Sequence, residues 1–232
     1  MKILLSIIGL LFLFGGPAAA ETVRLVSDRN EYGGTTKEVT YSKGEEGSDL
    51  ILKAIIYLDD NGKKVKVENH YTEQASGETG VGKSTTYFND AARAIRMEVY
   101  YDNAYEVKNG IGKMTVFLDD QGRKTKFEYF YTDEFGNRNG VSRTVVYVDA
   151  DEKTTRSERY YTEKFVNEKG IARMTVYYDT NGKEARAEYS YAGTNADERG
   201  FDRMVIYFNN EGKETKAEYY KNDRLIQTLP PQ

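Results

Sequence analysis

Several residue types that support common chemistries are absent or rare in this chain. Among 232 residues there is no cysteine and no tryptophan, and there is a single histidine, His70. Without cysteine the chain has no disulfide, no thiol nucleophile and no cysteine-linked lipid. The one histidine occupies a slot that other repeats fill mostly with aromatic residues, so we expect no Ser-His-Asp triad and no His/Cys zinc site. We therefore expect no enzyme, no metal and no cofactor.

Long apolar runs are scarce too, and the only one spans residues 3–14. It follows Lys2 and precedes the small residues 17–20 (PAAA). This pattern is typical of a secretory signal peptide, and the run is too short to cross a membrane. We expect residues 1–20 to be a signal peptide and the mature chain to be periplasmic or extracellular. A formal net charge of -4 argues against nucleic acid as a partner.

The chain is rich in a thirty-residue repeat. A glutamate recurs at this interval at Glu38, Glu68, Glu98, Glu128, Glu158, Glu188 and Glu218, and a glycine at Gly80, Gly110, Gly140, Gly170 and Gly200. Such a period is typical of repeat proteins, in which each unit buries its apolar side chains against its neighbours. We expect one repeat domain over residues 21–232. Its units lie near 21–49, 50–79, 80–109, 110–139, 140–169, 170–199 and 200–229.

Each unit is expected to form a β-hairpin. Residues 110–119 and 124–131 both alternate between apolar and polar and are rich in β-branched and aromatic residues. The Gln121-Gly122 pair between them suits a two-residue type I′ turn. That turn predicts four facing pairs on one face, namely Asp120 with Arg123, Leu118 with Thr125, Val116 with Phe127 and Met114 with Tyr129. Turns without the glycine, at residues 90–92 and 150–152, are expected to be looser.

These hairpins predict an all-β fold. We expect about seven tandem hairpins in an extended, curved antiparallel meander sheet, joined by eight-residue loops such as residues 132–139. The alternative is a closed barrel of fourteen strands, since ten-residue strands with short turns at one end and longer loops at the other are also used by outer-membrane barrels. Loops carry specificity on many scaffolds, so these connections are candidate binding elements.

An aromatic stripe is the most distinctive surface that the pattern predicts. On the charged side of the predicted sheet, the same slot of successive units holds Tyr57, Tyr87, Tyr147, Tyr177 and Tyr207. Such rings can stack on sugars or on a partner protein, so they form a possible binding face. The competing interpretation is that the rings pack over Lys and Arg stems and only strengthen the sheet.

Three local motifs have an ordinary structural interpretation. Residues 77–84 (GETGVGKS) match the phosphate-binding pattern GxxxxGK[ST], but that chemistry needs a strand before the loop and a helix after it. Here a strand is predicted after it. The acidic turn at residues 59–62 has turn chemistry rather than the spacing of a calcium loop. His70 occupies a slot that is mostly aromatic, so we expect a half-buried strand residue.

Residues 177–183 (YYDTNGK) resemble the tyrosine-aspartate repeats of large secreted bacterial shells. They are also similar to MORN hairpin repeats and to the cell-wall-binding hairpins of secreted enzymes. Those families have other periods, and the wall-binding type relies on tryptophan, which is absent here. The resemblance covers the hairpin alone and implies a tandem hairpin fold.

These observations favour a non-enzymatic exported repeat protein. It would act as a binding or structural scaffold at the bacterial cell envelope, with a protein or polysaccharide partner. The alternative is an outer-membrane β-barrel, in which the apolar face would meet lipid. Charged and polar residues on that face, such as Lys37, Arg159 and Lys221, argue against it, because a midplane Arg costs about 2–4 kcal/mol.

Overall fold

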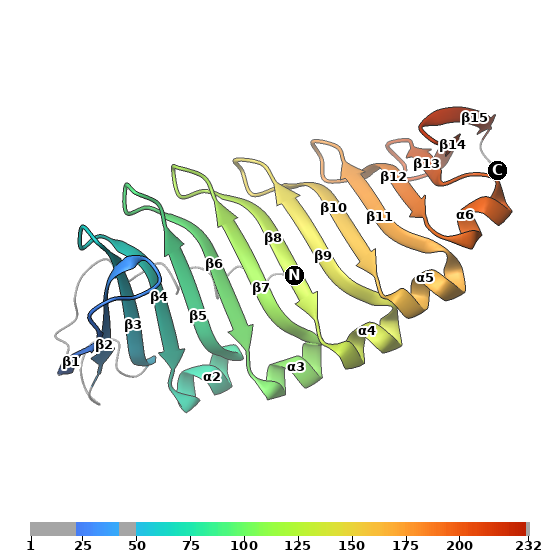
Figure 1. The fold of residues 1–232 in the computed structure, drawn as a ribbon. Coiled ribbons are helices and arrows are strands. Elements are labelled where there is room, and N and C mark those ends of the chain that lie inside the picture. Colours follow the sequence, from blue (N-terminus) through green and yellow to red (C-terminus); the bar gives the residue numbers. More distant parts are fainter. Residues whose placement is uncertain (1–21, 42–49, 231–232) are drawn as a thin grey trace. The chain divides into compact units, whose positions relative to one another are not determined.

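The computed structural model describes residues 22–41 and 50–230, and most of them lie in one antiparallel sheet (Figure 1). The signal peptide expected at residues 1–20 lies outside this part of the chain. The strands are β1 (Thr22–Ser27), β2 (Gly33–Thr40), β3 (Ile51–Asp59), β4 (Lys64–Tyr71), β5 (Val81–Phe88), β6 (Ala94–Tyr101), β7 (Ile111–Leu118), β8 (Lys124–Tyr131), β9 (Val141–Val148), β10 (Thr154–Tyr161), β11 (Ile171–Tyr178), β12 (Glu184–Tyr191), β13 (Arg203–Phe208), β14 (Glu214–Lys221) and β15 (Arg224–Leu229). The helices are α2 (Glu73–Thr79), α3 (Asn103–Asn109), α4 (Asp133–Asn139), α5 (Glu163–Lys169) and α6 (Thr194–Arg199).

The strand order follows the chain from β1 to β15, which confirms the predicted meander. β1 and β15 end this order, so the sheet is open and the closed fourteen-stranded alternative is wrong. The fifteenth described strand arises because the chain reverses once more after β14. By its contacts the chain divides into two compact units between Tyr105 and Glu106, and each is described by itself.

The turns of the repeated hairpins differ from the predicted type I′ form. In the β7–β8 hairpin, the Gly122 N–H donates to the Asp119 carbonyl at 2.9 Å, and the Asp119 N–H donates to the Arg123 carbonyl at 2.9 Å. Gly122 has φ +78°, whereas Gln121 is not left-handed. This is a three-residue loop that ends in a left-handed bulge. The Asp119 carboxylate stabilises it by accepting from the backbone N–H groups of Gln121 and Arg123.

Turns without glycine are not looser, so that expectation is wrong. Ala92 and Glu152 adopt the same left-handed conformation, with φ +57° and +60°. The closing hydrogen bonds are also retained, since the Ala92 N–H donates to the Asn89 carbonyl at 2.8 Å and the Glu152 N–H to Asp149 at 3.0 Å. The Asn or Asp at the start of the turn accepts hydrogen bonds from backbone N–H groups and fixes the turn geometry. This holds even where Ala92 or Glu152 adopts a left-handed conformation that favours glycine.

The strand register confirms the predicted pairs that lie away from the turn. Met114 lies opposite Tyr129 and Val116 opposite Phe127. Next to the turn the bulge shifts the register, so Leu118 pairs with Lys124 and not with Thr125. The faces of the sheet are therefore assigned as the alternation predicted, and only the residues beside the turn move.

The connections between hairpins are short helices, so the prediction of loops is wrong. They lie at the ends of the strands opposite the hairpin turns (Figure 1). Thr132 caps α4 by accepting the Phe135 N–H at 3.3 Å, and Gly140 ends the helix with φ +76°. The same Thr cap begins α2 and α5. These caps satisfy backbone groups that a seven-residue helix otherwise leaves unpaired.

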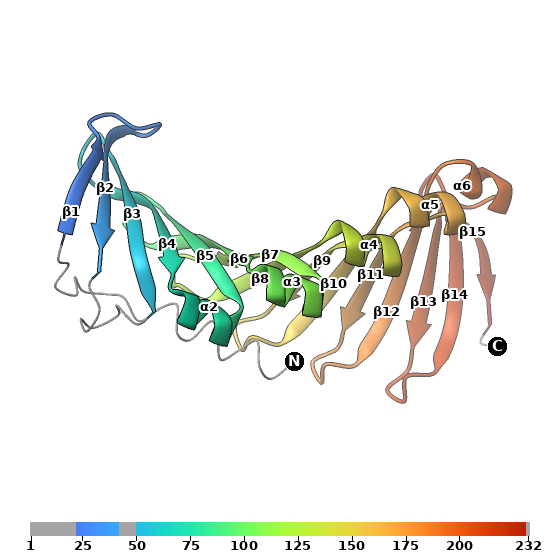
Figure 2. The ribbon, with the colours of Figure 1, turned by 90° about the horizontal axis from the view of Figure 1, so that it is seen from below.

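Within each compact unit, a hydrogen bond links neighbouring helices. Its acceptor is the carbonyl of the glycine that ends the preceding helix. The Gly110 carbonyl accepts the Thr132 N–H at 2.9 Å, and the Gly140 carbonyl accepts the Thr162 N–H at 2.7 Å. A Cβ at Gly140 would collide with the ring of Phe165. Seen from below, α4 and α5 are neighbours, as these contacts require (Figure 2). The repeated glycine therefore serves both the left-handed turn and this close approach.

Buried side chains occur on both faces of the sheet. On the face that we call the apolar face, Met97, Val99, Met114 and Val116 are at most 3% exposed. On the opposite face, which we call the charged face, small residues such as Thr115, which lies opposite Glu128, are also buried. The sheet is therefore stabilised by side chains that cover one another along each face.

Candidate binding face

The five tyrosines of the predicted binding face lie on the charged face. Tyr57, Tyr87, Tyr147, Tyr177 and Tyr207 are all half-buried. Across the sheet each pairs with a Lys or Arg, for example Tyr147 with Lys126 on one side and Arg156 on the other. Rings and cations thus alternate across the strands in what we call the first aromatic row, in which Phe117 takes the tyrosine slot of β7.

Each ring of the first aromatic row is stacked against the cation of its own hairpin. The distances from cation to ring centroid are 3.7 Å for Lys66–Tyr57, 3.8 Å for Arg96–Tyr87, 3.6 Å for Lys126–Phe117, 3.8 Å for Arg156–Tyr147, 4.0 Å for Arg186–Tyr177 and 4.2 Å for Lys216–Tyr207. Each such contact contributes about 0.5–1 kcal/mol at an exposed site. The rings therefore stabilise the sheet, and a partner would meet rings that are already oriented.

A row of glutamates runs beside the first aromatic row, and we call it the glutamate row. Each carboxylate forms an ion pair with the cation two residues earlier, at 2.8–3.9 Å, and its side chain is only 10–19% exposed. The members are Glu68, Glu98, Glu128, Glu158, Glu188 and Glu218. Tyrosine hydroxyls also donate to Glu98, Glu158 and Glu218, so these three carboxylates have hydrogen bonds beyond their ion pairs.

Glu218 shows the strongest electrostatic effect of this arrangement. Hydrogen bonds from Lys216, Tyr220 and Tyr207 lower the pKa of Glu218 to about 2. In return, the hydrogen bond to Glu218, with some burial, raises the pKa of Tyr220 to about 12. The carboxylate is therefore charged and the phenol neutral at any physiological pH. Such a group is suited to holding structure rather than to moving protons.

A second aromatic row lies on the other side of the glutamate row. Here the cation of the first strand in a hairpin stacks on a ring of the second strand, as in Lys83–Tyr100 at 4.4 Å, Lys113–Phe130 at 4.5 Å, Arg143–Tyr160 at 4.1 Å and Arg203–Tyr220 at 4.0 Å. His70 occupies this row between Lys53 and Lys83. Burial, together with these lysines, lowers the pKa of His70.

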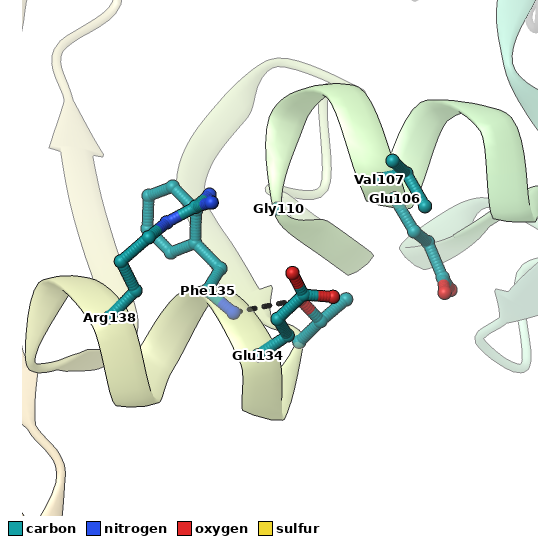
Figure 3. Close-up of a pocket in the computed structure, with 7 residues that line it drawn as sticks. Glu106, Val107, Gly110, Glu134, Phe135 and Arg138 are labelled. Carbon is teal, nitrogen blue, oxygen red and sulfur yellow. Dashed lines mark hydrogen bonds between the residues drawn. The ribbon is translucent and has the colours of Figure 1, made fainter.

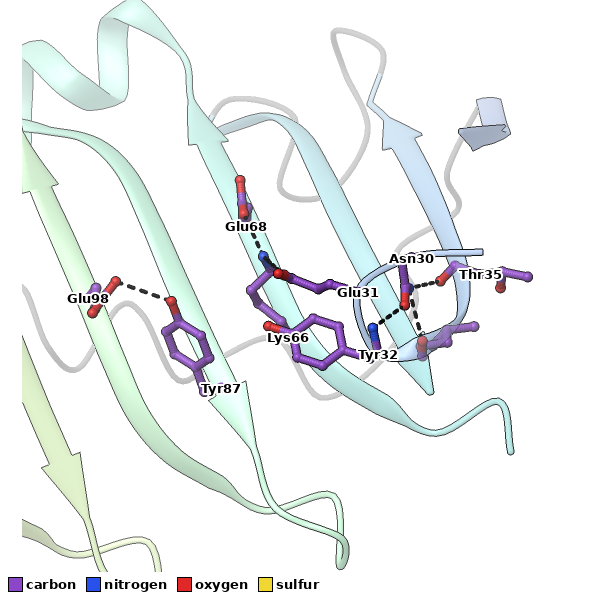
Figure 4. Close-up of polar contacts among 9 residues, drawn as sticks. Asn30, Glu31, Tyr32, Thr35, Lys66, Glu68, Tyr87 and Glu98 are labelled. Atoms are coloured by element: carbon purple, nitrogen blue, oxygen red, sulfur yellow. Dashed lines mark hydrogen bonds and ion pairs between the residues drawn. The ribbon is translucent and has the colours of Figure 1, made fainter. Parts of the chain in front are cut away.

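At the N-terminal end of the sheet, the β1–β2 turn folds onto the charged face (Figure 4). Lys66 bridges Glu31 at 3.1 Å and Glu68 at 3.3 Å, and the Tyr32 ring lies edge-on to Tyr57. Burial alone would lower the pKa of Lys66, but the hydrogen bonds to the two carboxylates outweigh it and raise the pKa. This end of the first aromatic row is therefore partly covered by the chain itself.

The phosphate-loop match does not form a phosphate site. Its residues run from the end of α2 into β5, which is the reverse of the strand-then-helix order that the motif needs. Lys83 instead stacks on Tyr100. Similarly, the Asp59 carboxylate accepts the backbone N–H groups of Asn61 and Lys63, as expected for a turn residue.

The connections also hold a small pocket, between the end of α3 and the start of α4 (Figure 3). Glu106, Val107, Glu134, Phe135 and Arg138 contribute to its lining. A volume of about 110 Å³ is well below the several hundred Å³ of ordinary ligand pockets. The charged face is therefore the more extensive candidate surface.

Neither a membrane-spanning helix nor a metal-binding cluster occurs among the described residues. In residues 22–41 and 50–230, no helix has the length and hydropathy that crossing a membrane requires. In the same ranges, no three His, Cys, Asp or Glu side chains gather as a metal site.

Comparison with known proteins adds little. No protein-family model and no curated protein matches the chain. One similar solved structure is a Tc holotoxin pore of Photorhabdus luminescens, which aligns with 91% of this chain at 11% identity and a TM-score of 0.26. The alignment covers 12% of the toxin chain. A score this low carries no argument about function.

Proposed function

We propose that this chain is a non-enzymatic exported repeat protein that acts as a binding or structural scaffold at the bacterial cell envelope. Its partner would be an envelope protein or polysaccharide that lies across the charged face. The observation that supports the proposal is the repetition of ring, cation and carboxylate from hairpin to hairpin. A repeated surface suits an extended partner, whereas catalysis uses one distinct constellation of groups.

The spacing of the repeat gives the proposal a geometric form. Adjacent strands of a sheet lie about 4.8 Å apart. Within one compact unit, the cation–ring stacks of successive hairpins therefore recur about every 9.6 Å. A partner that repeats over a similar distance would meet the same groups several times. Weak contacts of this kind add up through multivalency without any single strong site.

Cosedimentation with insoluble peptidoglycan and pull-down with purified envelope proteins test this function. The chain from residue 21 would be compared with a Tyr147→Leu/Tyr177→Leu variant, and a Tyr129→Leu/Tyr189→Leu variant on the apolar face is the matched control. We expect the first variant to bind roughly tenfold more weakly and the control to bind like the parent. Equal binding by all three chains would contradict a role for the charged face.

A further inference from the structure

Ser190 interrupts the second aromatic row. In the other three hairpins of the second compact unit, the corresponding position holds a ring, namely Phe130, Tyr160 or Tyr220. Each of these rings is stacked on a cation of the first strand of its hairpin, at 4.0–4.5 Å. In the β11–β12 hairpin the pair is Arg173 with Ser190. A hydroxymethyl group cannot cover a guanidinium, so this cation lacks the ring that its counterparts have within their own hairpins. On its other side Arg173 lies opposite Tyr160, but that ring is stacked on Arg143.

Arg173 is correspondingly uncovered. It is exposed, whereas Lys113, Arg143 and Arg203 in equivalent positions are half-buried. Within the part of the chain that the structure describes, the Arg173 side chain makes no hydrogen bond, ion pair or cation–π contact. Ser190 also pairs with Arg203 on its other side, so two arginines flank the missing ring.

The adjacent carboxylate lacks the second contact that a tyrosine supplies elsewhere. In the hairpins on either side, the Tyr160 hydroxyl donates to Glu158 at 2.7 Å and the Tyr220 hydroxyl donates to Glu218 at 2.7 Å. Glu188 has its ion pair with Arg186 at 3.0 Å, and no phenol donates to it among the described residues. In the neighbouring hairpins one tyrosine contacts both the cation and the carboxylate. Here Arg173 and Glu188 are both present, but no tyrosine of their own hairpin contacts them.

We propose that Arg173, Glu188 and Ser190 form a docking position for a tyrosine side chain of a partner protein. The ring stacks on the Arg173 guanidinium, and the hydroxyl donates to the Glu188 carboxylate. The chemistry of the occupant is that of Tyr160 and Tyr220, which make these contacts within the chain. This inference rests on the proposed binding role of the charged face. It adds that the partner at this position is a protein.

Titration of the ¹⁵N-labelled chain with N-acetyl-tyrosine amide tests the site, with N-acetyl-phenylalanine amide as a comparison. We expect shifts of the Arg173 Nε–Hε signal with a dissociation constant on the order of millimolar. The phenylalanine probe lacks the hydroxyl and binds several-fold more weakly. The Glu188→Gln variant removes this preference. Equal binding of both probes by the parent chain would overturn the role of Glu188.

The Ser190→Tyr variant supplies the ring within the chain, so it tests the site without damaging the fold. We expect it to melt at a higher temperature and to bind the tyrosine probe at least tenfold more weakly. Asn167→Tyr, an exposed position on α5, adds a tyrosine elsewhere and should bind like the parent. Unchanged binding by Ser190→Tyr, or no shift at Arg173 in the parent, would overturn the proposal.

The site and the proposed function fail separately. If the envelope partner binds but the tyrosine probe leaves Arg173 unshifted, the site is wrong and the scaffold function stands. If the probe binds while no envelope protein or polysaccharide does, the site stands and the function is wrong. Shifts at Arg173 with a soluble peptidoglycan disaccharide, and none with the tyrosine probe, would overturn the choice of a protein as occupant.

Discussion

At the scale of single residues, the third residue of the turn is left-handed in the six repeated hairpins from β3–β4 to β13–β14. Gly62, Gly122, Gly182 and Gly212 adopt this conformation without strain, but Ala92 and Glu152 adopt it as well. A side chain in this region costs about 1–2 kcal/mol relative to the ordinary conformations. Those two turns therefore hold strain that the aspartate or asparagine at the start of the turn must offset.

Replacement of Ala92 by glycine removes this strain. We expect Ala92→Gly to raise the free energy of unfolding by about 0.5–1 kcal/mol, since the greater flexibility of glycine in the unfolded chain offsets part of the gain. Urea denaturation measures the change. The reverse substitution, Gly122→Ala, is the control and should lower the free energy of unfolding by a similar amount. A destabilised Ala92→Gly variant would contradict the account.

The low pKa of Glu218 predicts a pH-dependent contribution to stability. Its folded pKa of about 2 lies below the usual value of about 4.3 for an unfolded glutamate. The stabilisation is therefore complete above about pH 5 and is lost as the pH falls towards 2. We expect Glu218→Gln to lower the urea midpoint at pH 7 and to lower it much less near pH 2.5. The same loss at both pH values would contradict the charged role of Glu218.

At the scale of elements, the helices that join the hairpins depend on the repeated glycine. At Gly140 the backbone is left-handed and the ring of Phe165 leaves no room for a Cβ. At Gly200 the backbone is equally left-handed, with φ +75°, but no atom lies near the position of a Cβ. A substitution at Gly200 therefore tests backbone strain alone, whereas a substitution at Gly140 tests backbone strain together with helix packing.

Alanine at these two positions should have different effects. We expect Gly140→Ala to cost about 2–4 kcal/mol, from backbone strain and overpacking together, and Gly200→Ala to cost only about 1–2 kcal/mol. Chemical denaturation of both variants measures the difference. A Gly140→Ala/Phe165→Ala double variant should lose less than the sum of its single changes, because the clash is gone. Equal costs at both glycines would contradict the packing role.

The hairpins were predictable from the sequence, whereas the helices were not recognised. The alternation around Met114 and Val116 predicted strands and register, because it extends over eight residues and one face is apolar. The helices are only six or seven residues long, too short to show a 3.6-residue period. Their available signal was the cap, a Thr such as Thr132 followed by acidic residues and, eight positions on, by Gly140.

The candidate face was only partly predictable. The thirty-residue period placed Tyr57, Tyr87, Tyr147, Tyr177 and Tyr207 on one side of the sheet. It did not reveal which cation covers which ring, since that depends on cross-strand geometry beyond the register. The exception at Ser190 becomes informative only once Arg173 is seen to be uncovered beside it.

At the scale of the whole molecule, the described chain consists of similar hairpins, each in contact chiefly with its neighbours. In such proteins stability is close to a sum of unit and interface contributions. The second unit contains consecutive hairpins that begin with the equivalent residues Gly110, Gly140 and Gly170. One hairpin can therefore be removed without changing how its neighbours meet.

Deletion of residues 140–169 tests this repeat logic. It joins Asn139 to Gly170, so the left-handed glycine after α4 is retained. We expect a folded protein with the same strand content per residue by circular dichroism. Its denaturation midpoint should be lower, since one thirty-residue repeat and its interface are lost. A deletion of fifteen residues from Gly140 breaks the period and is the control. Unfolding of the thirty-residue deletion would contradict the account.

The central claim, an exported scaffold at the cell envelope, is tested most directly by fractionating cells that express the full-length chain. We expect a chain that begins at Glu21 and is recovered in the osmotic-shock supernatant without detergent. A chain that keeps residues 1–20 and stays in the cytosol would contradict export. Recovery only after detergent extraction would contradict a water-soluble scaffold that meets its partner through the charged face.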